Sequence, residues 1–334
     1  MHCDSSLPLV SVLMPVYNAG DFLRPAILSI LNQTYSNIEL IIIDDGSTDT
    51  GIDSNQDLIK SDNRIRYIRQ ENTGRPGALN RGLGMMCGAF WMIEDADDIS
   101  HPQRIEKQLS VLLADSQLAA VFCKNDIILP DGRTFAPGCK GFNSSECKAL
   151  IDHGTVPAHD ATGLYRSERT SGYFFDEDMW LIEGVDFVIR IGENFPIAVV
   201  ADCLYSHRVN YGSVTHSQAD KIFAATEKFK TKMVQRRGGR ALSRKQRSTK
   251  RAKSTFKHRR YDTVLPYAMS SVVEQRRCGN WQVAFETAKI CLHLHPFDWL
   301  YYKPMVYCFT PLFLIDLYRS TKKPGEVFEI YNEK

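Results

Sequence analysis

Short apolar runs alternate with helix-like segments along much of the chain, and this alternation constrains the fold more than any other feature of the sequence. The runs are apolar on both faces, which predicts strands buried within a sheet. They lie at residues 9–14, 38–43, 65–69, 89–93, 119–123 and 197–201. The segments between them have helical spacing and begin near Asp21, Pro76 and Pro102. Strands that alternate with helices over short connections predict an α/β fold, with a mostly parallel, Rossmann-like sheet flanked by helices.

The rest of the chain has a different character. Residues 130–175 are rich in glycine and predict loops, and residues 176–192 predict a turn followed by a short helix. The sequence then becomes helical and basic. Its 334 residues suffice for one large α/β domain and an appendage. We therefore expect a sheet domain at 8–215 and a helical C-terminal region at 216–334, with a basic segment at 228–260.

An acidic cluster, Glu94-Asp95-Ala96-Asp97-Asp98, directly follows the run at 89–93. Mutual repulsion makes such a cluster unfavourable unless a cation neutralises it. Magnesium and manganese suit it, because these ions bind a few carboxylates and share the rest of their shell with water and phosphate oxygens. The alternative is a solvated acidic turn that caps the helix after Pro102. The cluster alone leaves both interpretations open.

Two other apolar runs also end in polar residues. Asp44-Asp45-Gly46-Ser47-Thr48-Asp49 ends the run at 38–43, and Pro15-Val16-Tyr17-Asn18 ends the run at 9–14. An Asp in the first turn can accept a hydrogen bond from a nucleotide base, although Asp-Gly turns and helix caps explain the same residues. In parallel α/β sheets, ligands bind beyond the carboxyl ends of the strands. Polar residues therefore converge where a binding site is expected.

These segments together resemble the family-2 glycosyltransferases, which have the GT-A fold. The resemblance rests on four stretches in the family's order and spacing: Val10–Asn18, Ile42–Asp49, Asn72–Gly82, and Glu94–Asp98 with Pro102. It covers roughly residues 8–215 and is densest in its first half. It implies a GT-A sheet domain that carries out an inverting, nucleotide-sugar-dependent transfer.

The resemblance also implies roles for single residues on the donor side. Asp97 would bind the metal, Mn²⁺ or Mg²⁺, while Asp95 would lie near the ribose and the metal, and Asp98 would support them. The nucleotide base would be recognised by Pro15, Val16, Tyr17 and Asp45. In the family, the stretch that contains Arg75 and Arg81 borders the nucleotide pocket. These arginines are candidates for contacting a phosphate, and a solvated helix face is the alternative.

The general base is where the sequence departs from the family pattern. Inverting transfer needs a carboxylate that takes a proton from the acceptor hydroxyl. The family usually places this acid in a Glu-Asp pair that opens a helix, after a stretch matched here by Gly172–Glu177. The chain has Glu183-Gly184 instead of that pair, so a glycine stands at the position of the expected Asp. Glu183 and Asp186 share a helix face and either can substitute, with Asp186 slightly favoured. The alternatives are that the base is lost or altered, or that it lies elsewhere, in the loop at 153–160.

Three histidines are further candidates for the site. His153 and His159 lie in the region that faces the acceptor in the family, although ordinary polar loop residues would look the same. His207 opens the stretch His207–Ser213, which resembles the closing segment of the family's catalytic domain. In that segment a His or Arg approaches the diphosphate, and a loop closes over the donor.

The C-terminal region suggests a membrane surface. Lys228–Arg260 contains fifteen Lys or Arg and no Asp or Glu, and its few aromatic residues argue against nucleic acid. Residues 299–315 are aromatic and apolar but broken by prolines, which predicts an interfacial anchor or the core of a small helical bundle. The N-terminus has no features of a secretory signal, and no apolar run is long enough to span a bilayer. We expect a cytoplasmic protein, peripheral on the inner face of a membrane.

The motifs and the resemblance together predict an inverting glycosyltransferase. It would move a sugar from a nucleotide-diphosphate sugar, expected to be a UDP-sugar, to a glycan or lipid-linked glycan by metal-assisted direct displacement. The alternative is a non-catalytic GT-A-like protein that binds a sugar nucleotide or a glycan and serves in assembly. The glycine at position 184 is the main support for that alternative.

Overall fold

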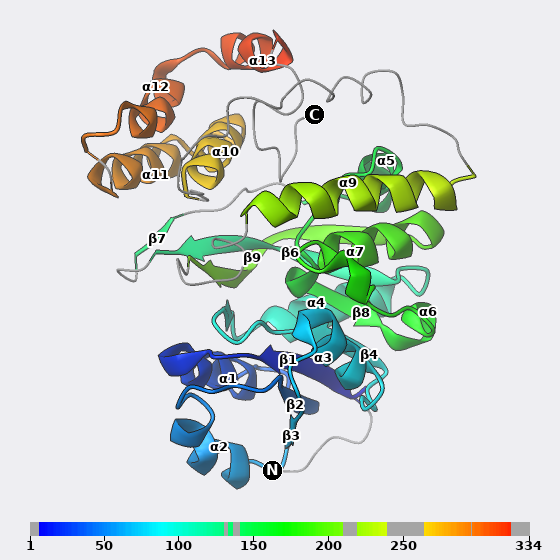
Figure 1. The fold of residues 1–334 in the computed structure, drawn as a ribbon. Coiled ribbons are helices and arrows are strands. Elements are labelled where there is room, and N and C mark those ends of the chain that lie inside the picture. The colour runs from blue at the N-terminus through cyan, green and yellow to red at the C-terminus, as the bar shows by residue number, and fades with distance from the viewer. Residues whose placement is uncertain are drawn as a thin grey trace. The chain divides into compact units, whose positions relative to one another are not determined.

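The computed structural model confirms an α/β fold in which helices flank a sheet (Figure 1). It describes residues 7–129, 133–135, 141–209, 219–238, 264–294 and 296–321. The chain divides into two compact units, Met1–Asn125 with Gly141–Arg208, and Asp126–Lys140 with Val209–Lys334. The first unit contains the strands that end in polar residues, and the second contains the C-terminal helices. A domain boundary at residue 215 stays a prediction.

Four strands of the first unit run parallel, in the order β3-β2-β1-β4. They are β1 (Val10–Val16), β2 (Ile38–Asp44), β3 (Ile65–Arg69) and β4 (Phe90–Ile93). β1, β2 and β4 are almost wholly buried, as expected of strands that are apolar on both faces. The register pairs Val16 at the end of β1 with Asp44 at the end of β2. This arrangement brings the polar ends of these strands to one edge of the sheet.

The other four pairings whose direction is established are antiparallel. One short strand is antiparallel to both β4 and the strand at 120–128, which leaves those two parallel to each other, so the sheet is mostly parallel, as predicted. β8 (Gly163–Arg166) pairs with β4 and with β6 (Ala120–Ile128), which also pairs with β7 (Thr134–Phe135). β5 (Ile99–Ser100) pairs with β9 (Ile197–Arg208). β8 begins with a glycine because a Cβ on Gly163 would lie 2.7 Å from carbons of the Tyr165 ring.

The glycine-rich stretch at 130–175 contains more regular structure than the loops predicted for it. Besides β7 and β8 it holds the helices α5 (Ser144–Asp152) and α6 (Ser167–Thr170), and the 3₁₀ turn η3 (Asp160–Thr162). A capping box opens α5, because the side chains of Asn143 and Glu146 each accept a hydrogen bond from the other's main-chain N–H at 3.0 Å. The Asn-x-x-Glu spacing is a local signal that identifies this helix start.

The remaining helices of the first unit are four that were predicted and a short one, at 56–61, that was not. They are α1 (Leu23–Leu31), α2 (Gln56–Ser61), α3 (Gly74–Leu83), α4 (Arg104–Ala114) and α7 (Glu183–Asn194). Short 3₁₀ turns precede three of them: η1 (Gly20–Phe22), η2 (Asp53–Asn55) and η4 (Glu177–Met179). One large core between helices and strands includes Val12, Ile27, Leu40, Met92 and Leu109.

An aromatic cluster holds α7 against the sheet. The Phe187 ring stacks on Phe175 at 4.2 Å between ring centroids and meets Trp91 and Tyr165 edge-on at 5.8 and 5.7 Å. All four side chains are buried. Burying a phenylalanine contributes about 1.5–3 kcal/mol, so these contacts fix the first turns of α7 beside β4 and β8.

Apart from β7 and the end of β6, the described part of the second unit is helical. Its elements are α9 (Ala219–Arg236), α10 (Val264–Arg277), α11 (Trp281–Leu294), η6 (Trp299–Tyr302), α12 (Lys303–Phe309) and α13 (Leu312–Thr321). Val272, Ala284, Ala288 and Cys308 form a small core between α10, α11 and α12. No helix in the described part of the chain is long and apolar enough to cross a membrane. Residues 239–260 of the basic segment lie outside the described residues.

Candidate functional site

The ends of β1 and β2 are joined into one rim at the edge of the sheet. Asn18 Oδ1 accepts a hydrogen bond from Thr48 N at 2.7 Å, and Asn18 N donates to Ser47 Oγ at 3.1 Å. Gly46 has a φ of 80°, and a Cβ there would lie 3.2 Å from Asn72 N, so the turn after β2 requires glycine. The two polar turns therefore form one structure.

The residues expected to recognise a nucleotide base lie on this rim. Val16 is buried, whereas the side chain of Tyr17 is 51% exposed and presents its ring to solvent. Asp45 is buried, and its two oxygens accept hydrogen bonds from Thr73 N at 2.9 Å and Gly74 N at 2.8 Å. Asp45 thus holds the start of α3, and a bound base would share it with these main-chain donors.

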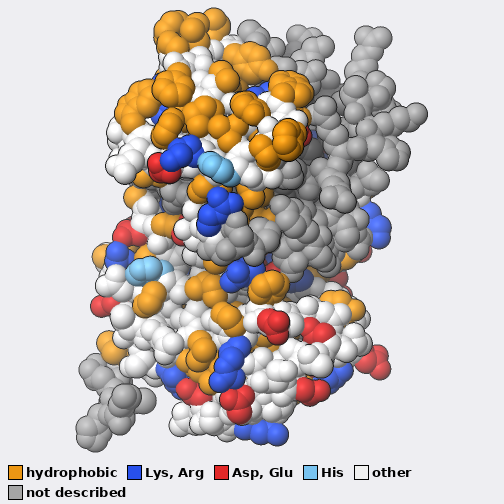
Figure 2. Space-filling model, turned by 90° about the vertical axis from the view of Figure 1, so that its left-hand side faces the viewer, with side chains coloured by type: hydrophobic (Ala, Val, Ile, Leu, Met, Phe, Trp, Pro, Cys, Tyr) orange, Lys and Arg blue, Asp and Glu red, His pale blue; other side chains and the backbone are white. Residues whose placement is uncertain are grey.

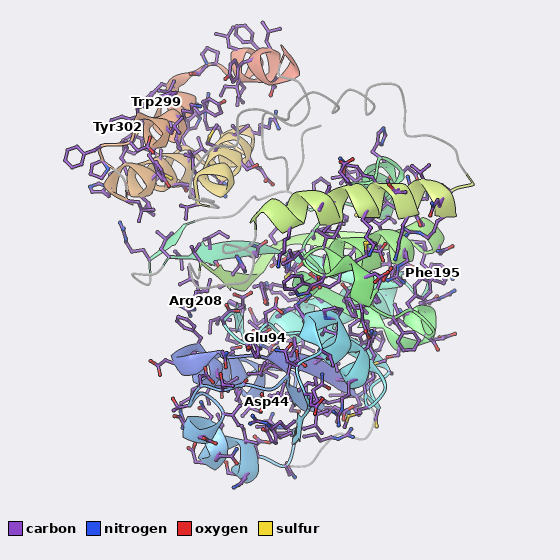
Figure 3. The ribbon with its side chains drawn as sticks, in the orientation of Figure 1. Asp44, Glu94, Phe195, Arg208, Trp299 and Tyr302 are labelled. Carbon is purple, nitrogen blue, oxygen red and sulfur yellow. The ribbon has the colours of Figure 1, made fainter. Side chains whose placement is uncertain are left out.

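Glu94, the first of the four acids after β4, has a structural position. Asp44 ends β2 and Glu94 follows β4, and these two strands lie on either side of β1 (Figure 3). Glu94 is fully buried and accepts hydrogen bonds from Arg104 Nη1 at 3.1 Å and Ser100 Oγ at 2.5 Å. Burial raises the pKa of Glu94 to about 8, against the opposing charge of Arg104. Glu94 therefore ties α4 to the end of β4.

Asp98 is bound by the last residues of β9. It accepts hydrogen bonds from Tyr205 Oη at 2.7 Å and Arg208 N at 2.8 Å, and His207 Nδ1 lies 3.1 Å from its Oδ2. Burial favours a higher pKa for Asp98, but His207 and the hydrogen bonds hold that pKa below its usual value. Burial likewise opposes the charge on His207, but Asp98 raises the pKa of His207 to about 9. The pair is therefore ionic at neutral pH. Residues 210–213 of the closing segment lie outside the described residues.

Asp97 differs from its neighbours because its carboxylate forms no hydrogen bond or ion pair with another residue in the described ranges. Only its main-chain oxygen is engaged, by Arg208 Nε at 2.9 Å. Burial and the negative charges of Asp98 and Asp95 raise the pKa of Asp97 to about 7. A hard divalent cation relieves this arrangement of crowded like charges.

The acids that are present fit an ion that takes few ligands from the protein. In the described part of the chain, no three His, Cys, Asp or Glu side chains form a metal-binding group. Mg²⁺ and Mn²⁺ need no such group, because water and phosphate oxygens complete their shells. Asp97, with Asp95 beside it, offers the one or two carboxylates that such an ion requires.

Arg75 joins the acidic cluster to two carboxylates from distant parts of the chain. Its Nε lies 3.0 Å from Asp95 Oδ1, and its Nη1 lies 2.9 Å from Asp160 Oδ2 and 3.2 Å from Glu183 Oε1. One guanidinium thus faces three carboxylates, and a net negative charge remains. The Arg75 cluster, defined by these four residues, links β4, η3 and the start of α7.

The two candidates for the general base have different partners. Glu183 is 6% exposed, and its Oε2 is buried without a hydrogen-bond partner. Burial raises the pKa of Glu183, against the charge of Arg75. Asp186 is 1% exposed and its Oδ2 lies 2.7 Å from Nε of Arg190 on the same helix. Glu183 therefore belongs to the Arg75 cluster, whereas Asp186 is engaged by its own helix.

The structure brings two of the three candidate histidines together. The rings of His159 and His207 lie 6.2 Å apart, and His159 Nδ1 lies 3.4 Å from Asp160 Oδ1. His153 instead ends α5 as an exposed residue. Arg81 is exposed on α3 and contacts Gln70, while Arg75 on the same helix faces the acids.

Asp160 is the site residue that the sequence reasoning missed. It is 4% exposed and lies 85 residues along the chain from Arg75, its closest charged partner. No local pattern marks it, because it opens a three-residue turn in a glycine-containing stretch. The pairing of β8 with β4 brings η3 close to the acids.

The sequence is similar to known glycosyltransferases. The model of the family described as "Glycosyl transferase family 2" matches residues 11–166. An "uncharacterized glycosyltransferase" of Haemophilus influenzae is 32% identical over 234 residues, which cover 64% of this chain and 72% of that protein. The "uncharacterized glycosyltransferase EpsJ" of Bacillus subtilis is 31% identical over 219 residues, covering 63% of each chain. The family match includes the strand-end acids, Arg75 and Asp160, and it ends before α7.

The structure is similar to that of S. aureus TarS. The crystal structure of TarS 1–349 in complex with UDP has a TM-score of 0.56 and 16% identity, over 94% of this chain and 92% of that chain. The complex with UDP-GlcNAc has a TM-score of 0.55 and 17% identity, over 68% and 67% of the two chains. At this level of identity, the likeness establishes a common fold alone.

Proposed function

This chain belongs to glycosyl transferase family 2 and is a glycosyltransferase, and we propose that its donor is a UDP-sugar and its acceptor a glycan or lipid-linked glycan. We further propose that transfer is an inverting direct displacement assisted by Mn²⁺ or Mg²⁺. The observation that carries this proposal is the partnerless carboxylate of Asp97, which lies among Asp95 and Asp98 at the edge formed by the ends of β1, β2 and β4. The UDP and UDP-GlcNAc held by TarS support the choice of donor.

The donor would lie along the rim. The exposed ring of Tyr17, with Pro15 and Val16 behind it, and the carboxylate of Asp45 would face the base. Asp95 would approach the ribose, and Asp97 would hold the metal. Once bound, the metal would neutralise charge that grows on the leaving diphosphate. His207 is charged at neutral pH and faces the same acids, so it adds positive charge beside the site.

The acceptor would approach the first turn of α7. Of the two acids named from the sequence, the contacts favour Glu183 over Asp186 as a residue of the acceptor site. Glu183 belongs to the Arg75 cluster, and its Oε2 is buried without a hydrogen-bond partner. Asp186 is held by Arg190 instead.

Release of UDP tests the metal assignment. Purified protein is incubated with UDP-GlcNAc and other common UDP-sugars, with Mn²⁺, Mg²⁺ or EDTA. Wild type should release UDP only with metal, and Asp97→Asn should lower the rate at least about 100-fold because transition-state charge is no longer neutralised. Asp202→Asn is the control, since Asp202 is an exposed acid on β9 paired with Lys107.

Two outcomes would redirect the proposal. Undiminished metal-dependent turnover by Asp97→Asn would refute the metal assignment. Binding of UDP, measured by thermal shift, without UDP release from any donor would instead support the non-catalytic alternative.

We also propose that the second unit contacts an anionic membrane surface from the cytoplasmic side. Hydrophobic side chains gather over the C-terminal helices (Figure 2), and Trp299, Phe309 and Phe313 are 67%, 71% and 68% exposed. Trp299 and Tyr302, which is 47% exposed, both lie on η6 (Figure 3). Lys303 Nζ lies 5.1 Å from the centroid of the Trp299 ring, which places a cation within this aromatic surface. Aromatic residues next to Lys and Arg favour the boundary of an anionic bilayer.

Co-sedimentation with vesicles tests this contact. The protein should sediment with phosphatidylglycerol-containing vesicles and less with phosphatidylcholine alone. The triple variant Trp299→Ser/Phe309→Ser/Phe313→Ser should lose most of the binding. Leu113→Ser, at a residue on α4 that is 58% exposed, is the matched control. Unchanged sedimentation of the triple variant would place the contact elsewhere or exclude it.

A further inference from the structure

The space beside Gly184 is already filled by a carboxylate. A Cβ built on Gly184 would lie 2.3 Å from Asp160 Cγ and 2.4 and 2.6 Å from its two oxygens. Non-bonded atoms do not approach this closely, so a side chain at 184 and the present position of Asp160 exclude each other. The chain thus has an acid in the place that a residue on the first turn of α7 would occupy, and that acid comes from η3.

Several contacts fix Asp160 in this position. Its Oδ2 lies 2.9 Å from Arg75 Nη1, and its main-chain oxygen accepts a hydrogen bond from Tyr165 Oη at 2.9 Å. Thr162 N donates to His159 O at 3.0 Å, which closes the turn. Tyr165 stacks on Trp91 within the aromatic cluster that also anchors α7. The same core therefore sets the position of Asp160 and of residue 184.

We propose that Asp160 is the general base, which takes over the role that the sequence resemblance implied for an acid at position 184. This inference rests on the proposed transferase function. In the step, the acceptor oxygen forms a bond to the anomeric carbon, and its proton passes to Asp160. The bond from that carbon to the diphosphate breaks, and the nucleoside diphosphate leaves with the electron pair.

The surroundings favour Asp160 over Glu183 for this role. Burial alone would raise the pKa of Asp160, but Arg75 and His159 hold it below its usual value, so the group is ionised and can accept a proton. Glu183 does not fill the space beside residue 184, where the atoms nearest to a Cβ all belong to Asp160. Glu183 is instead a positioning residue that shares Arg75 with Asp160.

Arg75 connects this carboxylate to the donor side. It bridges Asp160 and Asp95, and Asp160 is 4% exposed. A diphosphate bound beside Asp95 would compete with Asp160 for the same guanidinium.

A positional exchange of the carboxylate tests the proposal. UDP release is measured from the UDP-sugar that wild type hydrolyses best, with water as the nucleophile, for Asp160→Asn, Gly184→Asp and the double variant Asp160→Gly/Gly184→Asp. Asp160→Asn should lower kcat at least about 100-fold, leave the donor KM within about threefold, and remove the acid limb of the kcat–pH profile. Gly184→Asp alone should lose activity, because two carboxylates compete for one space. The double variant should regain at least a tenth of the wild-type kcat, and Asp202→Asn should match wild type.

The results separate catalysis from a structural role and from the function itself. If Asp160→Asn keeps kcat within about threefold of wild type, or loses donor affinity as strongly as kcat, Asp160 is not the base. If thermal shift shows that the double variant is folded, yet its kcat stays as low as that of Asp160→Asn, a carboxylate at 184 does not replace Asp160, and the proposal is overturned. If the double variant fails to fold, the kcat and pH profile of Asp160→Asn decide. If wild type itself releases no UDP, the proposed function fails, not the assignment of the base.

Discussion

The acids that follow β4 and the acids near the start of α7 reach the site in different ways. Asp95, Asp97 and Asp98 are almost adjacent in the sequence and follow one buried strand, so the chain cannot avoid placing them together. Asp160 and Glu183 are linked to Asp95 through Arg75, and the aromatic cluster and β8 hold their segments in place. The first group is built by local sequence and the second by tertiary structure.

The two groups therefore depend on different forces: the acids after β4 must have their charge neutralised, whereas Asp160 and Glu183 must be positioned by packing. The β4 acids repel one another and are stabilised by cations from elsewhere, which are His207 for Asp98 and Arg75 for Asp95. Asp97 receives no such partner among the described residues, and for this reason we propose it as the metal ligand. Asp160 and Glu183, called the α7 group, must instead be held in place by packing. Changes to Arg75 should affect both groups, and changes to the aromatic cluster should affect only the second.

Replacing Arg75 should have the largest effect, because one side chain serves both groups. Arg75→Met leaves Asp95, Asp160 and Glu183 without their shared guanidinium. Removing one partner of a buried ion pair costs about 3–5 kcal/mol, so we expect a loss of this size in the free energy of unfolding, measured in urea. UDP release should fall at least about 100-fold, because donor and acceptor residues lose their positions together.

A second arginine on α3 provides the control for this prediction. Arg81 is exposed and contacts Gln70 outside the cluster, so Arg81→Met should change stability by no more than about 0.5 kcal/mol. Arg75→Lys keeps the charge but not the planar fork, and it should recover only part of the stability. Equal stability of Arg75→Met and Arg81→Met would show that the four residues do not act as one cluster.

The same contrast explains how much the sequence could predict. The apolar runs correctly placed β1 to β4, β6 and β9, and the strand-end motifs correctly pointed to the edge where Asp45 and Asp95 lie. Strand β8 and its antiparallel pairings were not predicted. A strand of four residues that begins with glycine is too short to show a clear pattern of apolar residues. The sequence did not single out Asp160 as the base. That proposal depends on the space beside Gly184, which only the packed structure defines.

Weakening the aromatic cluster should have a smaller effect that is confined to the α7 group. Phe187→Leu removes the stacked contact with Phe175 and should lower the free energy of unfolding by about 1–2 kcal/mol. We expect kcat for UDP release to fall while the affinity for UDP stays unchanged, because the rim at β1 and β2 does not use this ring. Phe195→Leu is the control at the other end of α7 (Figure 3), where the ring meets Tyr173 edge-on at 6.2 Å and its centroid lies 5.9 Å from Arg169 Cζ. Loss of UDP affinity in Phe187→Leu would mean that the two groups are not separable.

The ion pair between His207 and Asp98 should produce the smallest effect, visible as a dependence of Tm on pH. The pKa of His207 rises from 6.5 to about 9 in the folded protein. The stabilisation from its charge is therefore complete below pH 6.5 and is lost as the pH rises through about 9. Wild type should lose Tm over this range in EDTA, and His207→Asn should start lower and show a flatter profile. His153→Asn, at the exposed end of α5, should follow wild type. A wild-type slope that persists in His207→Asn would show that another group titrates there, and that the β4 acids do not depend on β9 for their neutralisation.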